Sequence, residues 1–460
     1  MTMTSALRSA WPRVISLGGL LVASACSAPI DAPDQNAQAL SDLTGTPSVA
    51  AVTTATQGLI KGLRLAQTTQ LYSRLGREAY NLDPGNPQNF PAYYSTLGDL
   101  APWAFPYATI KLADLVIAPL DRVVGLSTAQ RESIRGFAKT IKATQLLTVI
   151  RATDVNGALL DAAANATDPP GPIASKAEVY TEIFKLLDEA QVHLTAGGSA
   201  FPFLLGPGFV GFDTPSTFLT FNRAIRARAD IDLKNWSAAL TDLNGSFVDT
   251  GAPLSKGVYE TFSLVSGDAT NGLYEGVPRL FFVHPRILAN AQSRPDGTPD
   301  SRVTTKVKAI PPFSRFGLTN VAATWTNYPS QSSPIAYLRN EELILLRAEA
   351  NLGLGNTSAA VADINFVRVN AGGLAPITLP YAPAAGAPPT LLDELLYNKT
   401  YSLMWEEGSS SWLDARRYGK LAQLPHDLPG QVVFPYLRIA DLECDARNPK
   451  PAGCTSPTGL

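Results

Sequence analysis

The chain has 460 residues, enough for one large domain or two ordinary ones. Apolar residues make up 45% and charged residues 17%, a balance typical of a folded globular protein that argues against extensive disorder. The formal net charge of −2 shows no basic footprint for nucleic acid and no strong attraction to an anionic membrane surface.

The first 25 residues have the pattern of an export signal peptide. Arg8 and Arg13 precede the apolar run Val14–Ala25, which ends in small residues. The run is too short to span a bilayer, which needs about 20 apolar residues. Small residues followed by Cys26 are typical of a bacterial lipobox, although Ala23 replaces the usual Leu. We therefore expect Cys26 to be lipidated and to anchor the chain through its acyl chains. An ordinary cleaved signal is the alternative.

Residues 26–54 are rich in Ala, Ser, Thr, Pro, Asp and Gln, which predicts a flexible tether. A single helical domain is expected from residue 55 to residue 460. Helical periodicity begins near Ala55 and continues to about Tyr80, where turn formers interrupt it. Further helices are predicted at Phe105–Ile117, at Thr128–Ala152 after the N-cap Ser127, and at Lys176–Leu194 after the N-cap Ser175.

An internal repeat follows. The stretch Arg226–Asn244 aligns without gaps to Arg347–Asn365, and ten of the nineteen aligned pairs are identical. Each copy has the pattern helix, short turn, helix, with Asn235 and Asn356 as expected polar caps of the second helix. This pattern resembles tetratricopeptide-type helix pairs, which stack to bury a shared apolar face. Thr128–Leu194 and Leu391–Arg417 are looser candidates for further pairs. Coincidence between two Ala-rich hairpins is the alternative.

The segment of about residues 245–333 changes character. It is rich in Gly, Pro, Asn and Thr with scattered aromatic residues, and no regular period persists in it. Phe281–Val283 is a candidate short strand. A long irregular excursion in a helical scaffold is usually functional or disordered, and its aromatic content argues against disorder.

Five segments, in chain order, resemble motifs of the SusD/RagB family of outer-membrane nutrient-binding lipoproteins. Trp103–Ile110 is similar to its W-x-x-x-Y-x-x-I helix, and Arg339–Ala350 to R-x-x-E-x-x-L-x-x-A-E-A. Asp363–Arg368 is similar to L-N-x-V-R, Trp405–Arg417 to E-G-x-R-x-x-D-L-R-R, and Phe434–Glu443 to the closing P-I-P-x-x-E. Two departures mark a divergent member: Ser409–Ser411 replaces the usual His-Arg, and Asp114 replaces a frequent Asn.

The resemblance implies a mostly α protein, built of tetratricopeptide-like helix pairs with an irregular, loop-rich insertion. It implies a surface-exposed lipoprotein of the outer membrane that binds a glycan or other oligomeric nutrient. The ligand would pass to a TonB-dependent (SusC-like) transporter, with neither catalysis nor a cofactor. A secreted tetratricopeptide-like scaffold that binds protein partners is the alternative. A glycoside hydrolase would need two carboxylates facing each other across a pocket, roughly 5 to 9.5 Å apart.

Flat aromatic faces pack on the CH faces of sugar rings, so exposed rings are the candidate ligand contacts. The ligand-binding candidates are Trp103, Tyr107, Tyr274, Trp325 and Tyr328. Trp103 and Trp325 are favoured because both flank loops. Core packing is the alternative for each ring.

The acids and arginines of the C-terminal motif, Glu406, Glu407, Asp414, Arg416 and Arg417, are interpreted as ion pairs between two helices rather than as a catalytic cluster. Cys444 and Cys454 are a disulfide candidate in an oxidising compartment, with two free thiols as the alternative. The only histidines, His193, His284 and His426, are not spaced with a cysteine as zinc ligands would be, so no metal site is expected.

Overall fold

A computed structural model describes residues 43, 45–86, 101–162, 168–276, 279–384, 386–408 and 411–460. The predicted signal peptide, Cys26 and most of the predicted tether lie outside these residues. No helix in these ranges has both the length and the apolar character needed to cross a bilayer.

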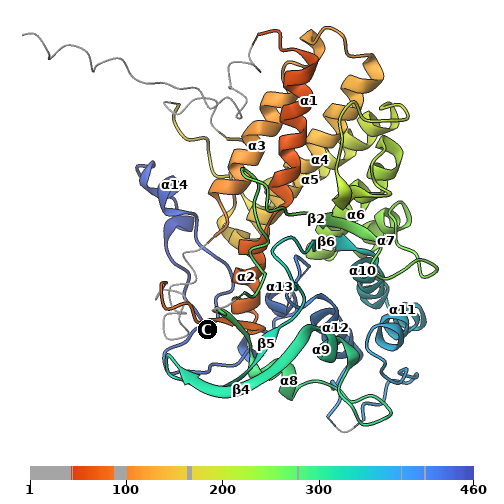
Figure 1. The fold of residues 1–460 in the computed structure, drawn as a ribbon, viewed down its shortest axis with the longest axis vertical. Helices are drawn as coiled ribbons and strands as arrows, with labels where there is room; N and C mark the ends of the chain where they lie inside the picture. The colour runs from red at the N-terminus through yellow and green to blue at the C-terminus, as the bar shows by residue number, and fades with distance from the viewer. Residues whose placement is uncertain are drawn as a thin grey trace, which may run out of the picture. The chain divides into compact units, whose positions relative to one another are not determined.

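Helices make up most of the regular structure, which confirms the mostly α fold class (Figure 1). The α-helices are α1 (Val49–Gly58), α2 (Ala66–Leu75), α3 (Ala104–Ile117), α4 (Thr128–Thr153), α5 (Lys176–Thr195), α6 (Pro215–Asp232), α7 (Trp236–Asn244), α8 (Pro285–Ala289), α9 (Ser301–Lys306), α10 (Asn340–Gly353), α11 (Thr357–Asn370), α12 (Leu391–Leu403), α13 (Ser411–Arg417) and α14 (Asp441–Asp445). Short 3-10 turns are η2 (Leu59–Leu63), η5 (Leu120–Arg122), η6 (Asp154–Asn156), η7 (Pro207–Phe209), η8 (Leu421–Gln423) and η9 (Ala452–Cys454).

The strands of the described residues form antiparallel two-stranded sheets. β1 (Ala79–Asn81) pairs with β3 (Phe281–Val283), and β2 (Gly257–Glu260) pairs with β6 (Ile335–Arg339). β4 (Val307–Arg315) and β5 (Leu318–Trp325) form a long hairpin with an irregular register. The β1–β3 pair ties the end of the N-terminal helices to the middle of the chain.

The predicted starts of α4 and α5 are confirmed by their caps. The Ser127 hydroxyl accepts the Gln130 N–H at 3.2 Å, and the Gln130 side chain accepts the Ser127 N–H at 2.9 Å. Ser175 and Glu178 form the same capping box at the start of α5. Each box satisfies two backbone N–H groups that a helix start otherwise leaves unpaired.

The prediction for the first helix is wrong at its start. α1 begins at Val49, before the predicted position Ala55, so residues 49–54 of the predicted tether are helical. The Ser48 side chain accepts the Ala51 N–H at 3.1 Å, so an N-cap starts this helix although Val and Thr in it are weak helix formers.

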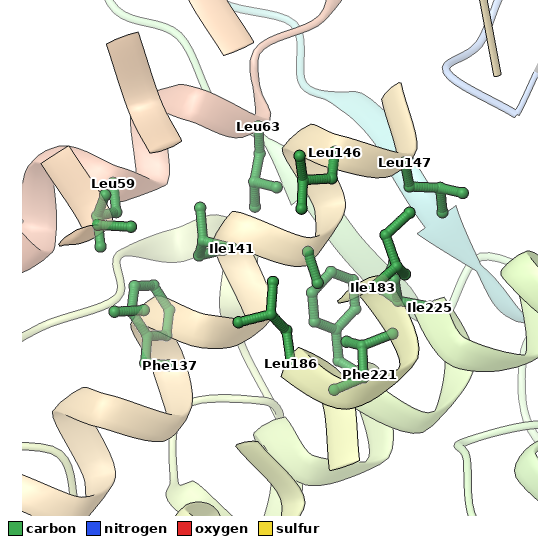
Figure 2. Close-up of a cluster of buried hydrophobic side chains, with 14 of the residues drawn as sticks. Leu59, Leu63, Phe137, Ile141, Leu146, Leu147, Ile183, Leu186, Phe221 and Ile225 are labelled. Carbon is green, nitrogen blue, oxygen red and sulfur yellow. The ribbon is translucent and has the colours of Figure 1, made fainter. Parts of the chain in front are cut away.

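The main core lies where α4 contacts α3, α5 and α6 (Figure 2). Apolar side chains from η2, α4, α5 and α6 interdigitate there, among them Leu59, Leu63, Phe137, Ile141, Ile183, Leu186, Phe221 and Ile225. Full burial of one such side chain contributes about 1.5 to 3 kcal/mol. This core fixes the N-terminal helices against the first repeat pair.

The predicted repeat is confirmed as two equivalent helix pairs, α6–α7 and α10–α11. Arg226 pairs with Asp242 in the first copy, and Arg347 pairs with Asp363 at 2.7 Å in the second. The pairs stack closely: a Cβ at Gly353, the last residue of α10, would lie 2.4 Å from the Trp236 indole of α7. The looser candidates also hold, since α4 contacts α5 and α12 contacts α13.

The expected capping role of the two repeat asparagines is wrong. Neither Asn235 nor Asn356 makes a side-chain cap bond to the helix that follows. Their amides instead reach back into the preceding helix, to Asp230 and Asn351, each at 3.2 Å. The asparagines therefore close the turn between the two helices.

The insertion of residues 245–333 is more regular than its sequence suggested. Phe281–Val283 is a strand, as predicted, but β2, α8, α9 and the β4–β5 hairpin were not foreseen. Pro311 and Pro312 lie inside β4, where proline is tolerated only at an edge or an irregularity. The prolines and the irregular pairing of the hairpin interrupt the alternation of apolar and polar residues by which a strand is recognised in a sequence.

Candidate functional site

Two of the predicted ligand contacts are core residues, so the prediction is wrong for Trp325 and Tyr328. Trp325 is 3% exposed, and its ring stacks on Trp405 with 5.1 Å between centroids and an angle of 2° between planes. The Tyr328 hydroxyl donates to the Trp405 carbonyl at 2.8 Å. The β4–β5 hairpin folds back on the C-terminal motif because burying these large rings together is strongly favourable.

Tyr107 is also buried, which contradicts its prediction as a ligand contact. Its hydroxyl donates to the Leu159 carbonyl at 2.9 Å and accepts the Leu159 N–H at 2.7 Å. Burial raises the pKa of Tyr107 well above its usual value. Tyr274 is half-buried beside Gly276 and remains a prediction.

Trp103 is also mostly buried, with 9% of its surface exposed, but unlike Tyr107 it lines a cavity. It precedes α3, packs on Tyr107 with 4.7 Å between ring centroids, and lines a cavity of about 760 Å³. Three segments surround this space, from residues 61–71, 101–106 and 262–272, and we call it the Trp103 cavity. Its size is within the range of small-molecule sites in proteins.

Apolar and aromatic groups form much of the wall of the Trp103 cavity. Phe105 is 47% exposed, which is unusual for so large an apolar ring. Phe262 is mostly buried behind the cavity, and Leu65 and Leu71 lie beside it. Flat apolar faces of this kind suit the CH face of a sugar ring.

The charged groups of the Trp103 cavity are Arg64, Asp268 and Lys61. Arg64 lies between η2 and α2 and forms a two-bond ion pair with Asp268, with Nη2 and Oδ2 3.2 Å apart. The Arg64 hydrogen bond holds the pKa of Asp268 well below its usual value. The guanidinium also lies over the Phe262 ring, 5.3 Å from its centroid. Lys61 is exposed, so the cavity presents an ion pair and one solvent-exposed cation.

Sequence reasoning missed Arg64, Phe105, Phe262 and Asp268. Arg64 and Asp268 are 204 residues apart, and no local pattern relates them. Phe105 lies within the W-x-x-x-Y-x-x-I segment, so its proximity to Trp103 was the available signal.

The acids and arginines of the family motifs are partners of one another in the interior. Glu342 accepts from Arg228 at 2.8 Å, and Glu406 accepts from Arg339 and Lys306, each at 2.7 Å. The Glu407 carboxylate accepts a hydrogen bond from the Thr69 hydroxyl at 2.9 Å. Glu406 and Glu407 are therefore structural, as predicted, but their partners are Arg339, Lys306 and Thr69 from other parts of the chain and not the arginines of their own motif.

A second network joins α10, α12 and α13. Lys399 contacts both Glu349 and Asp414 at 2.7 Å, and Arg417 contacts the same two acids at 2.8 and 2.7 Å. The side chain of Glu349 is fully buried. Arg416 instead donates to two backbone carbonyls, those of Pro435 and Arg151. None of these groups forms an open acid pair of the kind a glycosidase needs.

Near the C-terminus, Cys444 and Cys454 form a disulfide, so the disulfide candidate is confirmed. The bond closes the segment that carries α14 and η9. Within the described ranges no group of three His, Cys, Asp or Glu side chains is arranged to hold a metal ion.

No family model matches the sequence, and no curated protein matches it either. Several solved structures do match this chain in fold. NanU of B. fragilis aligns with a TM-score of 0.65 at 14% identity, over 93% of this chain and 100% of that chain. A SusD superfamily protein of Bacteroides thetaiotaomicron aligns with a TM-score of 0.62 at 14% identity, over 87% of this chain and 97% of that chain. A SusD-like carbohydrate binding protein of Bacteroides vulgatus aligns with a TM-score of 0.60 at 15% identity, over 80% of this chain and 83% of that chain. The chain therefore has the fold of the SusD superfamily, as its five motifs indicate.

Proposed function

We propose that this protein binds a glycan or another oligomeric nutrient in the Trp103 cavity. The observation that carries the proposal is the Trp103 cavity itself, in which ring faces surround a fixed ion pair on a SusD-like frame. One of the proteins that share this fold is a SusD-like carbohydrate binding protein.

The chemistry of the cavity suits a hydroxyl-rich ligand. Phe105, which is 47% exposed, provides most of the flat apolar surface for a sugar ring, and the mostly buried Trp103 lies beside it in the wall. Arg64 and Asp268 provide a donor and an acceptor that already hold each other in place. Because the ion pair is formed in advance, little conformational entropy is lost when a hydroxyl binds to it.

We propose further that the protein is a lipoprotein on the outer face of the outer membrane. The export signal and Cys26 support this proposal, and acyl chains on Cys26 would anchor the chain. In this setting the bound nutrient passes to a TonB-dependent (SusC-like) transporter, and the protein itself is not an enzyme. The buried, paired state of Glu406 and Asp414 supports a non-catalytic role.

A scaffold that binds protein partners through its helix pairs would leave its helical surface bare and the insertion of residues 245–333 disordered. The described parts of the excursion instead form strands and helices that pack against the C-terminal motif. No observation favours the scaffold over the binder.

The test is binding of the mature chain to a panel of polysaccharides, by retardation gels and then by calorimetry. Phe105→Ala removes an exposed ring at little cost to folding, and Trp103→Ala removes the ring that the sequence indicated. Each is expected to weaken binding about tenfold or more, equivalent to about 1.4 kcal/mol. Tyr436→Ala is the matched control, because Tyr436 is partly exposed and lies outside the cavity.

Binding that is unchanged in both cavity variants would remove the Trp103 cavity as the site. Equal losses in the cavity variants and in the Tyr436→Ala control would show a general effect on the fold. Failure of every glycan, with retention of a peptide ligand lost in Phe105→Ala, would keep the cavity and change the nutrient class.

A further inference from the structure

A second cavity, of about 300 Å³, lies where the ends of three long helices meet α13. Its wall is formed by η6 after α4, the first two turns of α5, the turn between α6 and α7, and one face of α13. We call it the Lys234 cavity, after a residue of that turn which lines it. It shares no lining residue with the Trp103 cavity, and its size suits a compact ligand rather than an oligomer.

A buried tyrosine of this cavity has a hydroxyl without a partner. Tyr180 lines the cavity and is 3% exposed, and its hydroxyl makes no hydrogen bond with any described residue. The oxygen is nevertheless not sealed in the core, so the cavity is what it opens to. Burial raises the pKa of Tyr180 well above its usual value, so the hydroxyl keeps its proton as a donor. The buried Tyr107, Tyr328 and Tyr401 hydroxyls each donate to a backbone carbonyl, so a free donor here calls for an acceptor in the cavity.

The two carboxylates that line the Lys234 cavity are already neutralised by cations. Asp154 pairs with Lys176 at 2.5 Å. Asp232 contacts Arg417 at 2.6 Å and Arg151 at 3.0 Å, within a buried group in which three cations face three carboxylates. The other members of this neutral group are Lys399, Glu349 and Asp414. Neither lining acid therefore needs a further cation from the wall.

Arg416 is the first cation of the wall that no carboxylate matches. It donates to the carbonyls of Pro435 at 3.2 Å and Arg151 at 2.9 Å, which fixes the guanidinium and uses two of its five N–H groups. Asp154 is the closest carboxylate in the described structure, but it is 3.9 Å away and is held more closely by Lys176. Arg416 thus has N–H groups and a charge available for a ligand.

Lys234 is the second unmatched cation, and its position is unusual for a lysine. Its φ of 61° lies in the left-handed region that favours glycine. In the internal repeat it aligns with Gly355, which has a φ of 79° at the equivalent turn. Its ammonium lies 5.1 Å from the centroid of the Tyr418 ring and forms no ion pair within the described ranges. The first copy thus keeps a lysine at a strained position where the second copy has glycine, which points to a role for its charge.

The wall therefore has two positive charges in excess. Among the described residues, Asp154 and Asp232 are the acids that line the cavity. Glu407, the next acid beyond Arg151, belongs to a separate buried group with Arg228 and Thr69.

We propose that the Lys234 cavity binds the phosphate group of a small ligand, either inorganic phosphate or a phosphate monoester. A phosphate carries about two negative charges and several strong acceptor oxygens. Its charge balances Arg416 and Lys234, and one of its oxygens accepts from the Tyr180 hydroxyl. A carboxylate would balance only one of the two cations, and an uncharged sugar would balance neither. This site does not depend on the function of the Trp103 cavity.

The test is calorimetry on the mature chain, at a pH of about 8 where phosphate is a dianion, with inorganic phosphate, methyl phosphate and acetate as probes. Inorganic phosphate is expected to bind saturably, and acetate at least about tenfold more weakly. Methyl phosphate identifies the source of the group. Binding like that of inorganic phosphate assigns a monoester, weaker binding assigns the free ion, and either result supports the proposal.

Two variants remove one ligand contact each without a predictable cost to the fold. Lys234→Gly gives the first repeat copy the residue of the second, so the chain should be at least as stable, while phosphate binding weakens about tenfold. Tyr180→Phe removes a hydroxyl that bonds to no described residue, and it should weaken phosphate binding about threefold or more. Lys61→Gln, which removes an exposed cation at the Trp103 cavity, is the matched control and should leave phosphate binding unchanged.

Three results would overturn the proposal: no saturable binding of inorganic phosphate, equal binding of acetate, or phosphate binding retained in both Lys234→Gly and Tyr180→Phe. An equal loss of phosphate binding in Lys61→Gln would show a general effect of net charge and would also overturn it. Because the glycan assay depends on Phe105 and Trp103, either proposal can fail without the other.

Discussion

Replacing Glu349 with glutamine is expected to destabilise the fold strongly, because Glu349 balances a buried cluster of charges. Its carboxylate accepts from Lys399 at 2.7 Å, from Arg417 at 2.8 Å and from the Tyr418 hydroxyl at 2.9 Å. Arg417 also contacts Asp232 at 2.6 Å, and Asp232 contacts Arg151 at 3.0 Å.

The size of the effect follows from the charge balance of this cluster. Three cations, Arg151, Lys399 and Arg417, face three carboxylates, those of Asp232, Glu349 and Asp414. Glu349→Gln keeps the shape but leaves one buried positive charge without compensation. Breaking a buried pair in this way costs about 3 to 5 kcal/mol. That is a large part of the total stability of a typical protein, about 5 to 15 kcal/mol.

The assay is urea unfolding at neutral pH, followed by tryptophan fluorescence and circular dichroism. Lys399→Met should cost a similar amount, because it leaves one carboxylate without its cation. The double variant restores neutrality, so its loss should be smaller than the sum of the two single losses by about 1 to 3 kcal/mol. Lys185→Met is the matched control: its pair with Glu182 is exposed, and the change should stay within about 0.5 kcal/mol.

Two results would refute this reasoning. A loss below about 1 kcal/mol for Glu349→Gln would show that the cluster tolerates an unbalanced charge. Strictly additive losses in the double variant would show that Glu349 and Lys399 do not act on each other.

Two other variants test separate parts of the fold. Gly353→Ala places a methyl group 2.4 Å from the Trp236 indole, so it should cost about 1 to 3 kcal/mol, and Trp236→Leu should relieve that cost. Thermal midpoints check this, and a Gly353→Ala chain as stable as wild type would contradict it. Burial raises the pKa of Glu407 from 4.5 to about 7, so the folded chain holds a proton that the unfolded chain releases between these values. Stability should fall across that window by up to about 3 kcal/mol from Glu407 alone. Burial also raises the pKa values of Asp230, Glu260 and Glu275, so Glu407→Gln should reduce the total fall by that amount and not abolish it. Urea midpoints at about pH 5 and about pH 8 measure the fall in stability. An equal fall in the wild type and in Glu407→Gln would show that Glu407 does not cause it.

The helices with local signals could be predicted from the sequence. Ser127 and Ser175 begin α4 and α5 because their capping boxes lie within four consecutive residues. The repeat was visible because Arg226 and Asp242 recur at the same spacing as Arg347 and Asp363, and each pair closes the same contact.

The contacts that depend on distant residues could not be predicted. Trp325 flanks a loop in the sequence, but its partner Trp405 belongs to a motif 80 residues further along the chain, and their stacking buries both rings. The Trp103 cavity brings together three segments, of which only the one around Trp103 carried a recognisable pattern.

Arg339, Glu342, Glu349 and Arg417 belong to the motifs that resemble the SusD/RagB family, but they do not line the Trp103 cavity. They form ion pairs with other buried residues, so they stabilise the fold and are not expected to contact a ligand of that cavity. If the Trp103 cavity binds the ligand, we expect exchange of the short segment 262–272 between chains of this fold to change ligand preference, while the interior charges stay unchanged.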